Sequence, residues 1–318
     1  MRRTFLKVTG LALAAALVAA CGGSDDDNPG NIVEVAQAQG FTALIAAAQK
    51  AGLADELSAA NANLTVFAPS NAAFGALATQ LGFADATAMV TALPASALAS
   101  ILSYHVLPAR KTAADLVAGG TTQATIYTYA GAPAQLTLNT STGVRITDAA
   151  LTASSVTAAD VTTNNGVIHV VDKVLVPPGV LNVVQMAQVN PIFTTLVGAV
   201  SGAGLVPTLS GAGPFTVFAP TNDAFAAVAG TVAGLTATQL GTVLRYHVLP
   251  QQVLSSAIPF GTPVNTVAGQ PITITAGPAP TIARITDSTA TPKSIVAVDV
   301  RASNGVIHVL GGVLIPTL

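Results

Sequence analysis

The stretch that decides the architecture reads LTVFAPSNAAF at residues 64–74, and it returns as FTVFAPTNDAF at residues 215–225. The shared run Thr-Val-Phe-Ala before the proline is rich in β-branched and aromatic residues, which predicts a short strand. A proline then ends the strand, because it cannot donate a ladder hydrogen bond. The same short strand is therefore expected twice, 151 residues apart.

Three further motifs also occur twice, in the same order. YHVLP at 104–108 returns at 246–250, RITD at 145–148 returns at 284–287, and NGVIHV at 165–170 returns at 304–309. The spacing between matched residues drifts from 151 to 139, which short deletions explain. One domain of roughly 140 residues is therefore duplicated, and each copy is long enough to bury its own core. The seam is expected near Pro177-Pro178-Gly179.

Both copies follow one plan of helices first and strands later. Apolar residues recur at i, i+3, i+4 and i+7 in two segments: Phe41, Leu44, Ile45 and Ala48, then Phe193, Leu196, Val197 and Val200. This spacing predicts amphipathic helices with one buried stripe. Helix-capping side chains follow the two prolines of the duplicated strand, namely Ser70-Asn71 and Thr221-Asn222.

Late strands are expected at residues 167–171 and 306–310, which are β-branched runs. The two residues after each run, Asp172-Lys173 and Gly311-Gly312, predict a tight hairpin turn. Helices followed by strands give an α+β fold class for each copy.

The four motifs in this order resemble the fasciclin (FAS1) domain family. The resemblance covers residues 31–178 and 181–318, so we expect two tandem FAS1-like domains there. It implies wedge-shaped β-sandwich domains with flanking helices, and a role in adhesion or matrix binding without catalysis. One departure is Ala72, where the second copy has Asp223. Integrin recognition in animal members involves Tyr-His and Asp-Ile elements, and no Asp-Ile dipeptide occurs here, so it is not carried over.

The N-terminus has the features of an export signal. Arg2, Arg3 and Lys7 precede an apolar stretch over residues 8–20, which is too short to span a bilayer as a stable helix. Small residues then lead into Cys21, the single cysteine of the chain, in a pattern that resembles a lipobox. We therefore expect a lipoprotein signal peptide over residues 1–20 and a lipid attached to Cys21. The alternative is a plain secretory signal with an incidental cysteine.

Two features around this signal bear on export and sorting. The paired arginines resemble a twin-arginine signal, and a general-secretion signal fits equally well. Residues 21–30 are rich in glycine and aspartate, which predicts a flexible tether. A solvated spacer suits its acidic run, residues 25–27, better than a Ca²⁺ site. Gly22 after the cysteine resembles an outer-membrane sorting signal, so we expect a lipid-anchored protein of the cell envelope, at the outer membrane or cell surface.

The composition argues against nucleic acid as a partner. The chain has 318 residues, of which only 8% are charged and 4% aromatic, and it has no Trp. Without residues 1–20, 9 basic residues face 14 acidic ones, for a net charge of −5. An acidic, Trp-free chain offers neither a basic track for phosphates nor a stacking platform for bases.

The four histidines all lie in repeated motifs: His105, His169, His247 and His308. A metal site normally needs three or four ligands at close spacing, and no such spacing is present. We therefore expect no metal and no cofactor, and interpret His169 and His308, together with Asn71 and Asn222, as parts of a structural core motif.

Tyr104 and Tyr246 precede the first histidine of each copy. If the segment is a strand, Tyr104 and His105 point to opposite faces, as do Tyr246 and His247. One member of each pair is then a core residue, and the tyrosine is a candidate surface contact.

No catalytic constellation is found. The chain has no Gly-x-Ser-x-Gly nucleophile motif and no phosphate-binding Gly-x-x-x-x-Gly-Lys loop. The acids Asp148 and Asp160, with Asp287 and Asp299 in the second copy, are better explained by an ion pair or a turn cap than by a glycosidase pair. The protein is therefore not expected to be an enzyme.

The sequence predicts a non-catalytic surface lipoprotein for cell adhesion or binding of extracellular matrix, polysaccharide or a surface protein. The alternative is an envelope lipoprotein that binds a small molecule. A defined pocket lined by residues that differ between the copies favours this alternative.

Overall fold

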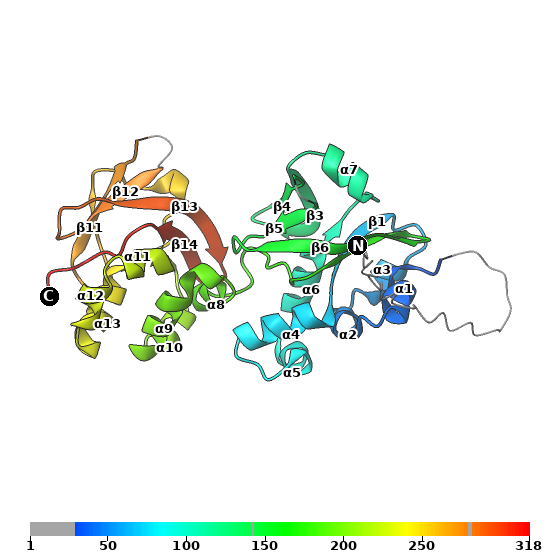
Figure 1. Ribbon diagram of the computed structural model, residues 1–318, viewed down its shortest axis with the longest axis horizontal. Helices are drawn as coiled ribbons and strands as arrows, with labels where there is room; N and C mark the ends of the chain where they lie inside the picture. The colour runs from blue at the N-terminus through cyan, green and yellow to red at the C-terminus, as the bar shows by residue number, and fades with distance from the viewer. Residues whose placement is uncertain (1–28, 142, 279–281) are drawn as a thin grey trace, which may run out of the picture.

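The computed structural model describes residues 29–141, 143–278 and 282–318. They form two successive units of helices and strands, arranged side by side along the long axis (Figure 1). The expected signal peptide over residues 1–20, Cys21 and most of the tether lie outside the described residues. At the described end of the tether, the carbonyls of Pro29 and Gly30 accept hydrogen bonds from Asn164 N, so this end lies on the first unit.

The first unit has seven helices and seven strands among its described residues. Its first half contains α1 (Ile32–Ala38), α2 (Thr42–Ala51), α3 (Ala54–Ser58), β1 (Leu64–Pro69), α4 (Asn71–Gln80), α5 (Ala86–Ala92) and α6 (Ala95–Tyr104). Its second half contains β2 (Val106–Leu107), α7 (Ala113–Ala118), β3 (Thr122–Tyr129), β4 (Ala132–Asn139), β5 (Arg145–Thr147), β6 (Ala153–Thr163) and β7 (Gly166–Val171).

The second unit repeats this order with shorter helices. Its first half contains α8 (Val183–Gln188), the 3-10 helix η1 (Pro191–Phe193), α9 (Thr194–Gly202), α10 (Val206–Ser210), β8 (Phe215–Pro220), α11 (Asn222–Ala226), α12 (Ala229–Ala233) and α13 (Ala237–Tyr246). Its second half contains β9 (Val248–Leu249), the 3-10 helix η2 (Ser255–Ala257), β10 (Pro263–Asn265), β11 (Pro271–Ala276), β12 (Ala283–Thr286), β13 (Lys293–Ala302) and β14 (Gly305–Leu310). The predicted α+β class is confirmed.

Each unit is built on one continuous seven-stranded sheet. The strand order is β2-β1-β7-β6-β5-β4-β3 in the first unit and β10-β11-β12-β13-β14-β8-β9 in the second. β1 runs parallel to β7, with Leu64 opposite Gly166 and Pro69 opposite Val171. The other neighbouring strands are antiparallel, and β6 has two register shifts against β7. The two sandwich layers are thus halves of one bent sheet, whose end strands β2 and β3 approach each other.

The strand β1 is covered on both faces of the bent sheet, and all six of its residues are buried. Phe67 faces the inside of the bend, where it packs with Leu136 and Ile146. Its neighbours Val66 and Ala68 point the other way, toward the helices. Most of the helices lie along one side of the sheets, whereas α7 lies on the opposite side, near β3 and β4 (Figure 1). Each unit therefore has an inner core within the sheet and an outer core beneath the helices.

Most of the predicted elements are present. The duplicated strands are β1 and β8, the late strands are β7 and β14, and the apolar stripes lie on α2 and on η1 with α9. Ser70 and Thr221 are the N-caps of α4 and α11, and their hydroxyls accept hydrogen bonds from Ala73 N and Ala224 N. The capping predictions for these two residues are confirmed.

The hairpin predicted at Asp172-Lys173 is wrong. The tight turn is Asn164-Asn165, which joins β6 to β7 and leaves Thr163 opposite Gly166. The Asp172 carboxylate instead accepts hydrogen bonds from Ser154 Oγ and Ser155 N at the start of β6. These bonds hold the segment that follows β7 beside the start of β6, so no further strand pairs there. In the second unit, the turn is likewise Ser303-Asn304 rather than Gly311-Gly312.

The chain between the units is hydrogen-bonded to both of them. Tyr127 Oη donates to the Pro178 carbonyl of the linker at 3.0 Å. Gly179 N donates to Arg301 O at 3.0 Å, and Ser303 N donates to Leu181 O at 2.8 Å. Limited hinge freedom follows from these contacts.

A second link joins the bodies of the two units. Asn190 Nδ2 donates to Ala150 O at 2.8 Å, and Asn190 is itself buried. The outer cores of the two units also form one apolar cluster.

Over the part of the chain that the structure describes, no single helix is long and apolar enough to cross a membrane. One bent pair, α5 with α6 at 117°, has the necessary length and composition.

Candidate functional site

The Tyr-His motif lies at a helix end in both units. Tyr104 is the last residue of α6 and His105 is its C-cap, and Tyr246 and His247 hold the same places on α13. The strand geometry considered for this motif is wrong, and all four side chains are buried. Tyr104 Oη donates to the carbonyl of Gln135 at 3.0 Å, and Tyr246 makes the equivalent bond. Neither tyrosine presents its ring at the surface.

The histidine of this motif connects the C-terminus of the helix with the segment that follows the last strand of its unit, β7 or β14. His105 Nδ1 lies 2.7 Å from Ile101 O, and Leu175 N donates to His105 Nε2 at 2.8 Å. A carbonyl only accepts and an amide N–H only donates, so Nδ1 carries the proton and Nε2 the lone pair. His247 makes the same two contacts, with Val243 and Leu314. Burial lowers the pKa of both imidazoles to about 4, so they are neutral at neutral pH.

The second histidine of each unit has the opposite tautomer. Asp160 N donates to His169 Nδ1 at 3.2 Å, and His169 Nε2 lies 2.9 Å from Lys111 O, to which it donates. His308 repeats this arrangement with Asp299 N and Val253 O, and burial lowers its pKa.

The aspartates that donate to these histidines are in the left-handed region, with φ of 58° at Asp160 and 60° at Asp299. Each lies at a register shift of its strand, where the extra residue turns the backbone N–H toward the imidazole. Their carboxylates then accept from the backbone N–H of Ala113 and Ser255, at 2.8 and 2.9 Å. Both residues therefore organise the bulge and the segment that follows β2 or β9.

Asn71 and Asn222 connect two helices rather than capping their own. Asn71 Oδ1 accepts from Ala43 N at 3.0 Å, and its Nδ2 donates to Gly40 O at 2.9 Å. Asn222 makes matching bonds with Thr195 N and Pro191 O. Asn71 is exposed and Asn222 half-buried, so their expected place in the core is corrected to the helix surface.

Asn165 and Asn304 are structural residues whose role the sequence pattern did not predict. Asn165 Nδ2 donates to Leu57 O and Ala59 O, and its Oδ1 accepts from Ile32 N. Asn304 binds the corresponding atoms of the second unit. The available signal was their position as the first residue of the repeated NGVIHV motif. Each one ties the β-turn before the last strand to the helices.

Asp148 is a buried turn cap. Its carboxylate accepts from the backbone N–H groups of Ala150, Thr152 and Val176 and from the Thr152 hydroxyl. Burial raises the pKa of this carboxyl, and these hydrogen bonds oppose the rise. Asp287 has the same role and accepts from Thr289 N and Ile315 N. The turn-cap interpretation of these two acids thus agrees with their contacts.

These contacts leave few of the repeated polar groups available to bind a ligand. Both ring nitrogens of all four histidines are hydrogen-bonded, so none has a free lone pair for a proton or a metal. Among residues 29–141, 143–278 and 282–318, no group of three or more His, Cys, Asp or Glu side chains is arranged to hold a metal ion. The repeated polar residues therefore act as internal ties between segments.

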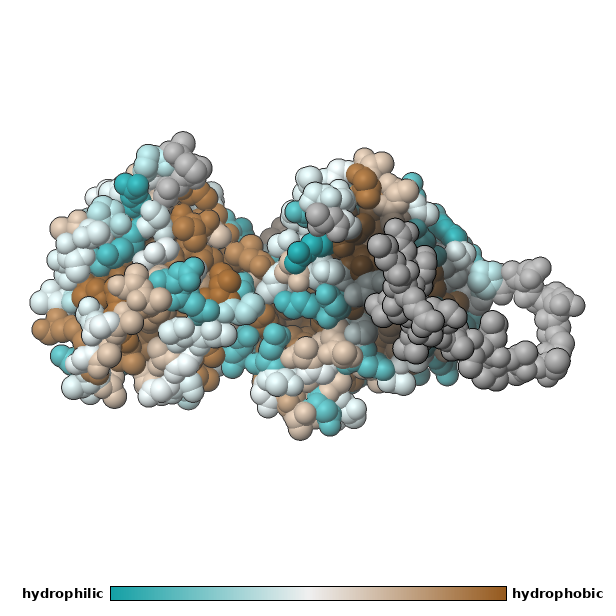
Figure 2. Space-filling model, viewed as in Figure 1, coloured by the Kyte–Doolittle hydropathy of each residue, from teal (hydrophilic) through white to brown (hydrophobic). Residues whose placement is uncertain are grey.

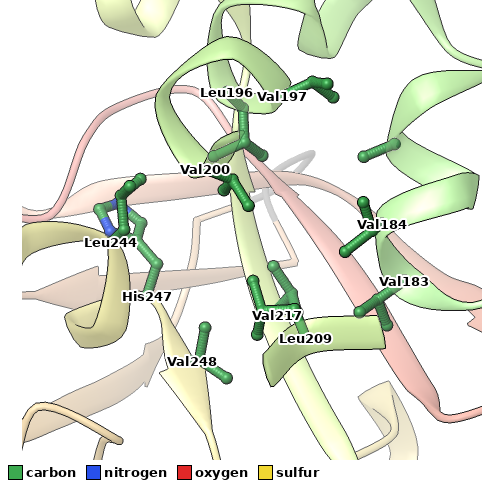
Figure 3. Close-up of a pocket in the computed structure, with 11 residues that line it drawn as sticks. Val183, Val184, Leu196, Val197, Val200, Leu209, Val217, Leu244, His247 and Val248 are labelled. Carbon is green, nitrogen blue, oxygen red and sulfur yellow. The ribbon is translucent and has the colours of Figure 1, made fainter. Parts of the chain in front are cut away.

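One apolar pocket opens in the second unit, between the helices and the sheet (Figure 3). Val184 of α8, Leu196 and Val200 of α9, and Leu244 of α13 point into it. The hollow amounts to about 440 Å³, including its open mouth. His247 also lines it, but both of its ring nitrogens are engaged. The pocket thus offers hydrocarbon surface and no free hydrogen-bonding side chain.

Comparison with known proteins identifies both units. The Fasciclin domain family matches residues 39–177 and 191–316. Protein sll1483 of Synechocystis sp. is 40% identical over 145 residues, which cover 43% of this chain and 75% of that protein. The fasciclin-like arabinogalactan protein elcF of Phaeosphaeria nodorum is 29% identical over 262 residues, which cover 80% of this chain and 78% of that protein.

Animal proteins are also similar over part of their length. The transforming growth factor-beta-induced protein ig-h3 of Sus scrofa is 29% identical over 167 residues, which cover 51% of this chain and 23% of that protein. A solved FAS1 domain pair from the insect cell adhesion molecule fasciclin I covers 88% of this chain and 97% of its own, with 18% identity and a TM-score of 0.45. The Fasciclin match over both units confirms the resemblance noted in the sequence, and the chain belongs to the fasciclin domain family, with two of its domains in tandem.

Proposed function

We propose that this protein is a surface lipoprotein that presents two fasciclin domains for adhesion, with extracellular matrix, polysaccharide or a surface protein as the partner. Fasciclin-domain proteins are related to adhesion and the extracellular matrix and are non-catalytic at the family level. The observation that carries the proposal is the use of the repeated His, Asp and Asn side chains as internal hydrogen-bonding partners. With those groups engaged, the outer surface is the part of the protein available to a partner.

The surface offers both kinds of contact that adhesion needs. Figure 2 shows hydrophobic and hydrophilic residues mixed over the visible face of both units. Large apolar side chains are exposed in each, including Val117 at 54% and Val296 at 58%. Two linked domains also bind more tightly than one when a partner carries repeated sites, because the second contact forms at a high effective concentration.

The proposed anchor is a lipid on Cys21, which holds the domains at the outer membrane or cell surface by way of the tether, residues 21–30. Small residues lead directly into this cysteine, and they support the assignment. Two acyl chains give stable attachment where a single one gives marginal binding. The protein then lies on the membrane surface and exposes its two units to the outside.

The test compares adhesion of cells that carry the intact protein with adhesion of cells that carry Cys21→Ser. We expect the variant to be released into the medium and adhesion to fall to the level of cells without the protein. A matched Ser24→Ala variant keeps the cysteine and is expected to adhere normally. Unchanged adhesion with the Cys21→Ser protein confirmed in the medium would overturn the proposal.

Binding of a small molecule is the second candidate function. The apolar pocket of the second unit favours it, because several of its lining residues differ from their counterparts in the first unit.

A further inference from the structure

The two units differ most in their layer of helices. Between the duplicated strand–helix motif and the Tyr-His motif, the second unit is nine residues shorter. In the first unit this stretch includes α5, which buries Met89 and Val90 against the outer core. In the second unit α12 replaces α5 and buries none of its residues. Thr231, which stands where Met89 stands in the first unit, is exposed.

A lysine fastens α5 in the first unit. Lys50, near the end of α2, donates from Nζ to Val90 O at 3.0 Å and to Thr91 O at 2.6 Å. These carbonyls are at the C-terminus of α5, where a cation also interacts well with the helix dipole. Gly202 holds the position of Lys50 in the second unit, so this link has no counterpart there. The helix α9 therefore lacks the cover that α5 gives to α2.

The pocket lies beneath this uncovered helix. Three of its wall positions differ between the units: Ile32 against Val183, Ile45 against Val197, and Ala48 against Val200. The first two exchanges remove one methylene each and the third adds two carbons, so the volume of the walls is nearly unchanged. The hollow consequently reflects the arrangement of the helices. α2 packs on α1, α3, α4, α5 and α6, whereas α9 packs on α8, η1, α11 and α13.

The chemistry of the walls determines what the pocket accepts. Its lining is aliphatic except for His247, whose Nδ1 and Nε2 are bonded to Val243 O and Leu314 N. A polar ligand group placed inside would lose its water without gaining a partner, which is unfavourable. The space is narrow, and the hollow of about 440 Å³ includes open solvent at its mouth.

We propose that the pocket between α8, α9 and α13 of the second unit binds a single alkyl chain. The chain lies against Val184, Leu196 and Val200, and its polar end stays at the mouth. The first unit binds no such chain, because its helices are held together by α5. This site is independent of the adhesive surface, since it lies under the helices of one unit.

The direct test follows methyl resonances of the full chain by NMR during titration with hexanoate, octanoate, decanoate and dodecanoate. Burial of one methylene strengthens binding about fourfold. We therefore expect the affinity to rise by about that factor per added methylene, and to level off once the chain fills the pocket. The methyl groups of Val184, Leu196 and Val200 should shift and saturate, while those of Leu44 and Ile45 in the first unit stay unchanged.

A substitution that fills the pocket tests the site, and a substitution at an exposed position is its control. Ala187 lines the pocket, and Ala187→Leu places a larger side chain in it. We expect at least a tenfold loss of decanoate affinity, whereas Ala237→Leu, at an exposed position on α13, should leave the affinity unchanged. If Ala187→Leu does not fold, the chain-length series on the unmodified protein still decides the question.

Two sources of an alkyl chain can be separated with the same readout. Tighter binding of decanoate than of monomeric lysophosphatidylcholine identifies a free fatty acid, and the reverse order identifies a lipid tail. Absence of saturable shifts at every chain length overturns the proposal. Equal shifts in both units also overturn it, because they indicate non-specific adsorption. Loss of cell adhesion in Cys21→Ser has no bearing on either result.

Discussion

The imidazole of His169 lies over the ring of Phe67, with 5.7 Å between the ring centroids and a tilt of 31°. The two residues are directly opposite each other on the parallel strands β7 and β1. Phe218 and His308 repeat the contact at 5.7 Å. The two longest repeated motifs are therefore neighbours in the sheet, and each histidine fixes the bulge beside it through Asp160 or Asp299.

Replacing this histidine by an apolar residue should destabilise the first unit. His169→Leu leaves Asp160 N and Lys111 O, whose hydrogen bonds to the ring are part-buried, without their partners, and an unsatisfied buried group costs at most about 1–3 kcal/mol. We expect the free energy of unfolding in urea to fall by about 2–4 kcal/mol. The exposed control Gln49→Leu should change it by less than about 0.5 kcal/mol. An unfolding midpoint equal to that of the unmodified protein would show that the hydrogen bonds of His169 contribute nothing net.

Stability should depend on pH through His105 and His247. Their pKa is lowered by burial from 6.5 to about 4 in the folded protein, so between these values the unfolded chain binds more protons. The contribution of each histidine is therefore complete above pH 6.5 and is lost as the pH falls toward 4, by up to about 3 kcal/mol. Urea unfolding at a series of pH values measures this slope.

The buried carboxyl of Asp148 has the opposite effect on how stability depends on pH. Burial raises its pKa, so its contribution to stability is present at low pH and declines as the pH rises past its ordinary value of 3.8. The histidine contribution is isolated with His105→Gln, for which we expect a shallower slope between pH 6.5 and 4. A slope as steep as that of the unmodified protein would contradict the assignment to His105.

Replacing Asn165 should lower the stability of the first unit more than replacing most other polar residues. Asn165→Ala removes two donors from the carbonyls of Leu57 and Ala59 and one acceptor from Ile32 N. We expect a loss of about 2–4 kcal/mol in the free energy of unfolding and faster amide exchange in α1 and α3. Asn139→Ala, on an exposed asparagine, is the control and should leave exchange in those helices unchanged.

The hydroxyl of Tyr127 should restrict the angle between the two units. Tyr127→Phe keeps the ring beside Tyr104 but removes the hydrogen bond to Pro178 O. We expect a stability loss of about 1 kcal/mol and a broader distribution of inter-unit orientations, measured by small-angle scattering and residual dipolar couplings. Identical couplings in Tyr127→Phe would show that the remaining linker bonds, such as Gly179 N to Arg301 O, are sufficient.

The sequence predicted the architecture well because the duplication supplied each pattern twice. The strands β1 and β8 were identified from local composition and a terminal proline. The parallel pairing of β1 with β7 was not predicted, since register between distant segments depends on which faces the helices cover. The resemblance to the fasciclin family supplied the sandwich, and the bend of one continuous sheet emerged only from the pairing of β6 with both neighbours.

The site was harder to predict than the fold. YHVLP has strand-like composition, yet Tyr104 completes a helix that begins at Ala95, and only Val106 and Leu107 pair as a strand. A five-residue pattern does not reveal this, because the preceding ten residues determine the helix. The roles of Asn71 and His169 depend on carbonyls more than thirty residues away, which no local pattern specifies. The apolar pocket lies among α8, α9 and α13, and α13 is far from the other two in the sequence, so the pocket walls gave no local signal.

The hydrogen bonds of the linker also affect how the protein carries tension. Tyr127 and Arg301 belong to different units, and both hold the short segment from Pro178 to Gly179. When one end of the chain is fixed and a partner pulls on the other unit, tension passes through this segment. Hydrogen bonds on both sides of it share that tension before either sheet is stretched. Under the proposed adhesive role, the two units carry this force together, and the lifetime under tension depends on the unfolding rate of the weaker unit.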